Sequence, residues 1–204
     1  MTRQTRAAPL GHRGWRALAR LLGWTVVYVP PPNQGRKAVL VAYPHTSNWD
    51  FLPAMLMRAV VPLPLHWIGK HSLFRGPMGG LMRWLGGVSL DRRQVGGNFT
   101  EAVATLIRDS DQMLLALSAE GTRARADHWR SGFYYIALKA QVPIGLCYID
   151  WRRREVGIGG YLQPSGNIEQ DFGKFELFFQ DVTGRHPERQ TPVILRPSDP
   201  ESPQ

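Results

Sequence analysis

Short continuous apolar runs, which are typical of buried strands, alternate along the chain with amphipathic stretches that have helical spacing. The predicted strands are Trp24–Val29, Lys37–Ala42, Leu65–Gly69, Val88–Leu90, Met113–Leu117 and Ile144–Ile149. The predicted helices are Asp50–Val60, Pro77–Leu85, Asn98–Arg108, Ser131–Lys139 and Asp171–Val182. This alternation predicts an α/β fold with a mostly parallel or mixed sheet flanked by helices.

The first predicted helix, at residues 13–22, has two chemically different faces. Its basic face carries Arg13, Arg16 and Arg20, and its opposite face carries Trp15, Leu18 and Leu22. Such a helix is typical of a segment that lies on a membrane surface. It is equally typical of a surface helix that packs its leucines against the domain, so the sequence leaves both interpretations open.

The chain of 204 residues is long enough for one domain with a helical extension. Beyond Trp151 the pattern weakens, and we expect a hairpin at Glu155–Leu162 and a mobile tail, rich in Pro and Ser, from Thr191. We therefore divide the chain into a basic N-terminal segment with the amphipathic helix and a short strand at 1–36, a main domain at 37–190 and a flexible tail at 191–204.

The charge balance favours an anionic partner. The chain holds 25 Lys and Arg against 16 Asp and Glu, a net charge of +9, and seven of the basic residues precede the first acidic residue, Asp50. A basic nucleic-acid-binding module is an alternative of another class, but the sequence has no zinc-finger spacing, RNP signature or recognisable helix-turn-helix. We expect an anionic membrane surface as partner and no nucleic acid.

The sequence predicts a cytoplasmic protein that is peripheral on the inner face of the cell membrane. No run reaches the roughly 18 apolar residues needed to span a bilayer, since Arg58 and three prolines interrupt Phe51–Gly69. Arg20 and the Pro30–Pro32 run do not fit a signal peptide. The single cysteine, Cys147, excludes an internal disulfide, and we interpret it as a core residue.

The first candidate for chemistry directly follows the strand Lys37–Ala42. Ligands of open α/β sheets bind beyond the carboxyl ends of strands, which is where His45 lies. His45 and Asp50 can meet only if His45 is in the loop and Asp50 in the first helical turn. The carboxylate would then fix the imidazole tautomer and leave the other nitrogen free to take a proton. The alternative is a capping box formed by Ser47 and Asp50, a device that only starts a helix.

A second candidate, Ser118–Arg125, follows the buried strand Met113–Leu117 in the same way. Gly121 allows close approach of the backbone to a ligand, the Thr122 hydroxyl can donate, and Arg123 can grip a phosphate through two hydrogen bonds. The alternative is a solvated turn with ordinary surface arginines.

Taken together, these motifs resemble the glycerolipid acyltransferase family. His45 and Asp50 match its H-x-x-x-x-D motif, and Glu120-Gly121-Thr122-Arg123 matches its E-G-T-R motif. The segments Gly87–Arg92 and Val142–Ile144 look like its second and fourth blocks, and all four occur in the family order. The resemblance covers about Lys37 to Asp150 and makes 37–190 an acyltransferase domain.

The resemblance implies a fatty acyl transfer from a thioester to the hydroxyl of a glycerol-phosphate-type acceptor, 1-acyl-sn-glycerol-3-phosphate in the first instance, in phospholipid synthesis. His45 is then the general base and Asp50 its orienting partner. The acceptor site would use Lys70, His71, Arg92, Glu120, Gly121, Thr122, Arg123 and Arg125. The co-substrate would be acyl-CoA or acyl-ACP, with acyl carrier protein a possible partner, and we expect no bound cofactor and no metal.

Two departures from the family pattern concern the acceptor pocket. Ser118 and Ala119 stand where the family usually has an aromatic residue and a proline, and Leu146 replaces a second proline. A lysophospholipid or aminolipid O-acyltransferase therefore remains an alternative. A metal hydrolase built from His45, Asp50 and His71 is disfavoured, because no His pair has helical ligand spacing.

The reaction itself requires an apolar groove for the acyl chain beside His45. Its candidate liners are Leu52, Met55, Leu56, Trp67 and Trp84, each of which is also a candidate core residue. Direct transfer needs no serine or cysteine nucleophile, so we expect no acyl-enzyme.

Overall fold

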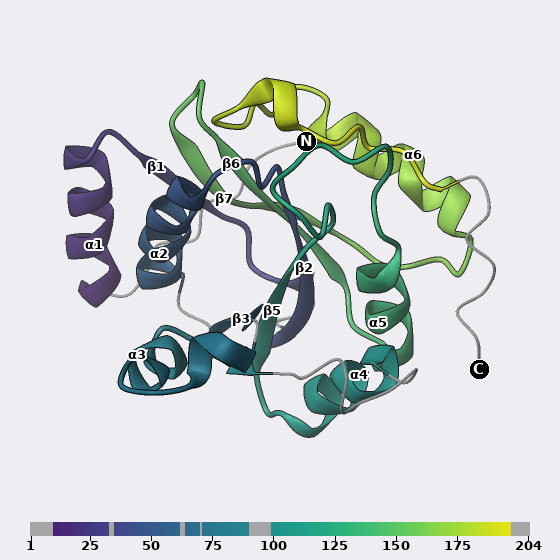
Figure 1. Ribbon diagram of the computed structural model, residues 1–204, viewed down its shortest axis with the longest axis horizontal. Coiled ribbons are helices and arrows are strands. Elements are labelled where there is room, and N and C mark those ends of the chain that lie inside the picture. Colours follow the sequence, from purple (N-terminus) through teal and green to yellow (C-terminus); the bar gives the residue numbers. More distant parts are fainter. Residues whose placement is uncertain (1–9, 33–34, 62–63, 70, 90–98, 197–204) are drawn as a thin grey trace.

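A seven-stranded sheet forms the centre of the computed structural model, which describes residues 10–32, 35–61, 64–69, 71–89 and 99–196 (Figure 1). The strands are β1 (Thr25–Tyr28), β2 (Lys37–Tyr43), β3 (Leu65–Gly69), β4 (Gly87–Ser89), β5 (Met113–Ser118), β6 (Ile144–Asp150) and β7 (Glu155–Leu162). The helices are α1 (Leu10–Leu21), α2 (Phe51–Val60), α3 (Met78–Trp84), α4 (Phe99–Asp109), α5 (Gly132–Ala140) and α6 (Ile168–Phe179). Short 3-10 turns are η2 (Asn48–Asp50), η3 (His71–Phe74) and η5 (Pro187–Arg189). The predicted α/β architecture is confirmed.

The strand order is β1-β7-β6-β2-β5-β3-β4, and β7 runs antiparallel to β6 while the other neighbouring pairs are parallel. Strand β2 lies between β5 and β6. Its last residues pair with the last residues of both neighbours: Ala42 with Ser118 of β5, and Tyr43 with Tyr148 of β6. The loops that leave β2, β5 and β6 therefore start side by side at one edge of the sheet.

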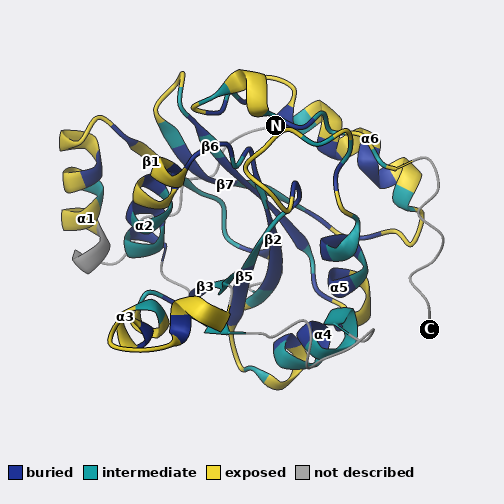
Figure 2. Ribbon diagram, in the orientation of Figure 1, coloured by how far each residue is buried: buried dark blue, intermediate teal, exposed yellow. Residues whose placement is uncertain are grey.

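Each face of the sheet has its own hydrophobic core. Successive side chains of a strand point to opposite faces. Thus Val39 and Val41 of β2 pack in the cluster with α4, α5 and α6, and Ala38 and Leu40 pack in the cluster with α1 and α2. Figure 2 shows these buried strands between helices whose outer faces are exposed. The two layers of helices hold the carboxyl edge of the sheet in place.

The predicted hairpin at Glu155–Leu162 is wrong. This segment is one strand, β7, and the hairpin is formed by β6 and β7 across the turn at residues 151–154. The glycines in β7 allow close packing rather than a turn: a Cβ on Gly157 would lie 2.1 Å from the Val27 carbonyl oxygen. The actual turn uses Arg154 at φ 52°, a left-handed conformation in which glycine is the expected residue.

The ends of the chain differ from the expected division. Strand β1 pairs with β7, so the segment before residue 37 contributes to the same sheet. Thr191, where we expected a mobile tail to begin, is fully buried, and Leu195 forms a β-bridge with Trp129. Helix α6 begins at Ile168, three residues before the predicted start, and its N-cap Asn167 accepts a hydrogen bond from the Gln170 N–H.

Helix α1 packs on α2 and leaves Leu18 and Leu21 exposed. Ala19 is fully buried, whereas Trp15, Leu18 and Leu22 are 48%, 39% and 49% exposed. The alternative in which this helix packs its leucine face against the domain is therefore not the one the structure adopts. No helix in the described ranges is long and apolar enough to cross a membrane.

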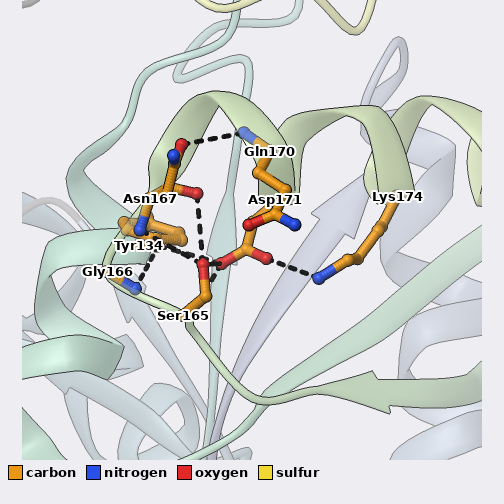
Figure 3. A network of polar contacts seen from close by, with 7 residues as sticks. All are labelled: Tyr134, Ser165, Gly166, Asn167, Gln170, Asp171 and Lys174. Atoms are coloured by element: carbon orange, nitrogen blue, oxygen red, sulfur yellow. Dashed lines mark hydrogen bonds and ion pairs between the residues drawn. The ribbon is translucent and has the colours of Figure 1, made fainter.

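A buried carboxylate, Asp171, ties the first turn of α6 to α5 (Figure 3). It accepts hydrogen bonds from the Tyr134 hydroxyl (2.9 Å) and the Ser165 N–H (2.7 Å), and it pairs with Lys174 (2.8 Å). Burial alone would raise the pKa of Asp171, but these donors outweigh it and the pKa is lowered. The network orients α6 against the core.

We predict that Asp171→Ala lowers the free energy of unfolding by about 2–4 kcal/mol, because it leaves buried donors without an acceptor. Glu169→Ala, which removes an exposed carboxylate from the same helical turn, is the control and should change it by no more than about 1 kcal/mol. Urea unfolding of the purified variants measures both. Equal effects of the two substitutions would contradict the assigned role of Asp171.

Candidate active site

The structure brings His45 and Asp50 together at the carboxyl end of β2. The His45 Nδ1 atom lies 3.1 Å from Asp50 Oδ2. His45 lies in the loop after β2 and Asp50 in the turn η2 that precedes α2, the arrangement in which the two can meet. The Asp50 side chain is 2% exposed, and the His45 side chain is 31% exposed. The dyad thus combines a buried carboxylate with an imidazole that is open to a ligand.

Three donors surround the Asp50 carboxylate. Oδ2 accepts from the Ser47 N–H (2.9 Å) as well as facing His45, and Oδ1 accepts from the Trp151 indole N–H (2.7 Å). Burial of Asp50 favours a raised pKa, but the hydrogen bonds from His45, Ser47 and Trp151 outweigh it, and the pKa is lowered. Because an ionised carboxylate only accepts, His45 must donate from Nδ1, which leaves Nε2 as an acceptor.

The capping box and the dyad are formed by the same atoms. The Ser47 side chain accepts from the Trp49 N–H (3.2 Å), and the Asp50 carboxylate accepts from the Ser47 N–H, as in a capping box. The two interpretations of this motif are therefore not alternatives. The helix-starting turn is the device that aims Asp50 at His45.

Glu120, after β5, anchors the loop that carries His45. Its buried carboxylate accepts from the backbone N–H of His45 and from the backbone N–H of Thr191 (3.1 Å). Burial raises the pKa of Glu120, and the two backbone donors oppose that rise. Glu120, the first residue of the E-G-T-R motif, thus anchors the loop that carries the H-x-x-x-x-D motif.

The remainder of the second motif lies beside the imidazole. Arg123 Nε donates to His45 Nε2 at 3.3 Å. Gly121 has a φ of +66°, a left-handed conformation that favours glycine, and the Arg130 guanidinium Nε would lie 2.7 Å from a Cβ at this position. The Thr122 hydroxyl accepts from the Ala124 N–H (3.2 Å) and stabilises the turn. A cation is therefore placed at the open nitrogen of His45.

The other predicted site residues are Lys70, His71, Arg92 and Arg125. Lys70 and Arg92 lie outside the described residues. His71 lies after β3, two strands from β2, and its Nδ1 pairs with the Ser89 hydroxyl (2.9 Å). Arg125 is exposed, and its charge acts on Tyr43. Burial raises the pKa of Tyr43, and the hydrogen bond to Gln190 and the charge of Arg125 offset part of that rise.

A cavity of about 1410 Å³ opens at the dyad, which is larger than the roughly 300–1,000 Å³ of ordinary small-molecule pockets. Its polar part is lined by His45, Asn48, Ser118, Thr122, Arg123 and Arg130. Its apolar lining comes from both faces of the sheet: Ala42, Met57 and Ala116 belong to the core on the α2 face, and Phe133 and Ile136 of α5 belong to the core on the other face. His45 therefore shares one cavity with cationic and with apolar side chains.

Two of the five predicted groove residues, Met55 and Trp67, line this cavity. Leu56 is buried in the core, while Leu52 and Trp84 are 47% and 72% exposed. Cys147 is buried, as expected for a core residue, and also forms part of the cavity wall. Burial raises the pKa of its thiol to about 12, so it remains protonated at neutral pH.

Trp151 and Thr191, which hydrogen-bond to Asp50 and Glu120, lie outside the two motifs and were not predicted as site residues. Trp151 follows β6 directly, so the rule that drew attention to His45 and Glu120 applies to it as well. Thr191 had no such signal, because its contact with Glu120 joins segments 71 positions apart. The Thr46 hydroxyl likewise accepts from the His186 N–H (3.2 Å), so the C-terminal segment supports both loops.

Within the ranges that the structure describes, no group of three or more His, Cys, Asp or Glu side chains is placed to hold a metal ion. The arrangement can instead transfer a proton at His45 Nε2 and bind an anion through Arg123.

We predict that Asp50→Asn lowers the free energy of unfolding at neutral pH by about 1–3 kcal/mol, because an amide has one acceptor oxygen for three donors. The folded pKa of Asp50 is below its ordinary value of 3.8, so its contribution is complete above that value and is lost as the pH falls through the folded pKa. The penalty should therefore shrink on acidification. Chemical denaturation across pH, with exposed Asp111→Asn as control, measures this, and a penalty that does not change with pH would contradict it.

Comparison with solved structures finds the 1-acyl-sn-glycerophosphate (LPA) acyltransferase PlsC from Thermotoga maritima, with 20% sequence identity and a TM-score of 0.53. The match covers 80% of this chain and 72% of that chain, and at this identity it shows a shared fold. Comparison with curated proteins finds no match. The profile of the Acyltransferase family matches residues 25–149, which run from the start of β1 to the penultimate residue of β6 and include both motifs of the site. The chain therefore belongs to the Acyltransferase family.

Proposed function

We propose that the protein transfers a fatty acyl group from a thioester to the hydroxyl of a glycerol-phosphate-type acceptor, 1-acyl-sn-glycerol-3-phosphate in the first instance. The observation that carries this proposal is the surroundings of His45. Its Nε2 atom accepts a hydrogen bond from the Arg123 guanidinium, and apolar side chains such as Met55 and Trp67 line the same cavity. Acyl transfer to an acceptor of this kind requires a general base, a binding site for the phosphate and space for the acyl chains, all close to one another.

In the proposed reaction His45 Nε2 takes the proton of the acceptor hydroxyl as its oxygen attacks the acyl carbon. The Nδ1–H bond to Asp50 stabilises the imidazolium that forms. When the tetrahedral intermediate collapses, the carbon–sulfur bond breaks and the proton passes from Nε2 to the departing thiolate. The products are an ester and a free thiol, and His45 is neutral again.

The contact between Arg123 and His45 gives the acceptor phosphate a second role. Nε2 has a single lone pair, so the acceptor hydroxyl and the Arg123 Nε–H compete for it. A phosphate offers the guanidinium charge-assisted, bidentate hydrogen bonds that a neutral imidazole cannot. Binding of the phosphate therefore draws Arg123 away from the base and holds the hydroxyl in its place.

Neither Cys147 nor Ser118 is activated as a nucleophile. The Cys147 thiol is buried and its pKa is raised to about 12. Ser118 belongs to the cavity lining, but its buried hydroxyl has no hydrogen-bond partner and therefore no base to activate it. We therefore propose direct transfer between the two substrates, and we place the acyl chain along the cavity residues on the α2 face of the sheet.

We predict that the purified protein acylates phosphate-monoester acceptors from a labelled thioester. Arg123→Ala should lower kcat/KM for those acceptors by about 10- to 100-fold, which corresponds to one lost charge-assisted hydrogen-bonding group. The assay compares acyl-CoA with acyl-ACP as donor, and phosphate monoesters with lysophospholipids and aminolipids as acceptors. Exposed Arg152→Ala is the control.

A loss confined to phosphate monoesters supports the proposal. An equal loss for acceptors without a phosphate monoester, or transfer only to such acceptors, would contradict it.

We also propose that the protein works on an anionic membrane surface and docks through α1. The exposed face of this helix carries Trp15, Leu18 and Leu22, and further exposed apolar side chains lie on α2 and α3, including Phe51 and Trp84. Residues 1–100 hold thirteen Lys and Arg but only two acidic residues. An apolar helix face on a basic half of the chain suits the boundary of an anionic bilayer, where each basic residue contributes about 1 kcal/mol.

We predict that Leu18→Ser combined with Leu22→Ser weakens binding to vesicles of mixed neutral and anionic lipids by about tenfold or more, because buried leucine surface is lost. The matched control is Leu138→Ser with Leu177→Ser, which removes two exposed leucines from α5 and α6. Vesicle flotation of the full chain measures both. Equal binding by the two double variants would remove α1 from the docking surface.

A further inference from the structure

The strongest unassigned contact in the site is made by Trp151. It follows β6 directly, at the edge of the sheet where β2 and β5 also end. Its indole Nε1 donates to Asp50 Oδ1 at 2.7 Å, across 101 positions of sequence. Its own backbone N–H donates to the Thr183 carbonyl at 2.8 Å, so both its main chain and its ring are held.

Aromatic and cationic neighbours fix the plane of this indole. Trp24 meets it edge to face, with ring centroids 5.1 Å apart and an interplanar angle of 85°. The guanidinium carbons of Arg185 and Arg154 lie 4.7 Å and 5.5 Å from its ring centroid. A ring held by these neighbours presents its N–H in one direction only.

The indole N–H of Trp151 affects His45 because the two oxygens of Asp50 have different hydrogen-bond partners. Oδ2 faces His45 Nδ1 and the Ser47 N–H, while Oδ1 faces Trp151. Without a partner for Oδ1, the carboxylate can turn about its Cβ–Cγ bond and exchange or split these contacts. A donor on Oδ1 keeps Oδ2 on Nδ1, and that contact fixes the tautomer with a free Nε2.

We propose that Trp151 is a positioning residue, which orients Asp50 through its indole N–H and thereby sets the tautomer of His45. Trp151 lies two residues beyond the region that matches the Acyltransferase family profile. The kinetic part of its test depends on the proposed acyl transfer, whereas the spectroscopic part does not.

Trp151→Phe removes the N–H and keeps an aromatic ring. It should lower kcat about tenfold or more with little change in KM, since a hydrogen bond to a charged group is lost. In an Asp50→Ala background the same substitution should cost less than about twofold, because Trp151 then has no acceptor to orient. Tyr161→Phe, which removes a buried hydroxyl without a hydrogen-bond partner from an aromatic ring of β7, is the control and should leave kcat near the wild-type value. Equal losses in both backgrounds, or a change in KM alone, would overturn the proposal.

Nitrogen-15 NMR of the histidine rings tests the same claim without any substrate. The wild-type protein should show His45 with Nδ1 protonated and Nε2 unprotonated, and Trp151→Phe should show a mixture of tautomers. An unchanged His45 spectrum would refute the role of Trp151, even if no acyl acceptor were found. If Trp151→Phe does not fold, β-(3-benzothienyl)alanine at position 151 replaces the N–H by sulfur within a ring of the same shape, and the same outcomes apply.

Discussion

The hydrogen bonding of one buried carboxylate, that of Asp50, determines the arrangement of the whole site. Burying an ionised group is costly unless donors replace the water it loses. Here the donors come from the loop after β2, from the turn that starts α2 and from the turn after β6. Satisfying Asp50 therefore requires that all three segments adopt one relative position. That position leaves the imidazole with its open nitrogen toward the cavity.

Glu120 repeats the principle with backbone donors. Its carboxylate joins the His45 N–H to the Thr191 N–H, so the chain segment after α6 is fastened to the loop of the first motif. Both anchors depend on the sheet order, in which β2 lies between β5 and β6. The same register brings Arg123 to His45, because the loop that carries Arg123 follows β5, whose last residue pairs with β2 near its end. Two buried acids thus organise a site whose exposed groups are basic.

The architecture could be predicted from the sequence because it rests on local patterns of apolar runs. The pairing of His45 with Asp50 was one of two interpretations that the spacing allowed, and the family motif favoured it. The sequence pattern led to a wrong prediction where glycines allow close packing. Gly157 and Gly159 indicate a turn, yet they admit the Val27 backbone and the Phe178 ring, while the real turn places Arg154 at positive φ. Contacts between distant segments, such as Thr191 with Glu120, leave no local pattern at all.

In the proposed reaction one imidazole nitrogen takes the proton of the acceptor in a single direct transfer. Rapid-quench measurement of one turnover, with a labelled thioester and the His45→Ala variant, tests this step. We expect the rate of ester formation to fall by about 10²- to 10⁴-fold, the usual contribution of a general base, and no label to become attached to the protein. Undiminished ester formation by this variant, or label bound covalently to the wild-type protein during turnover, would contradict it.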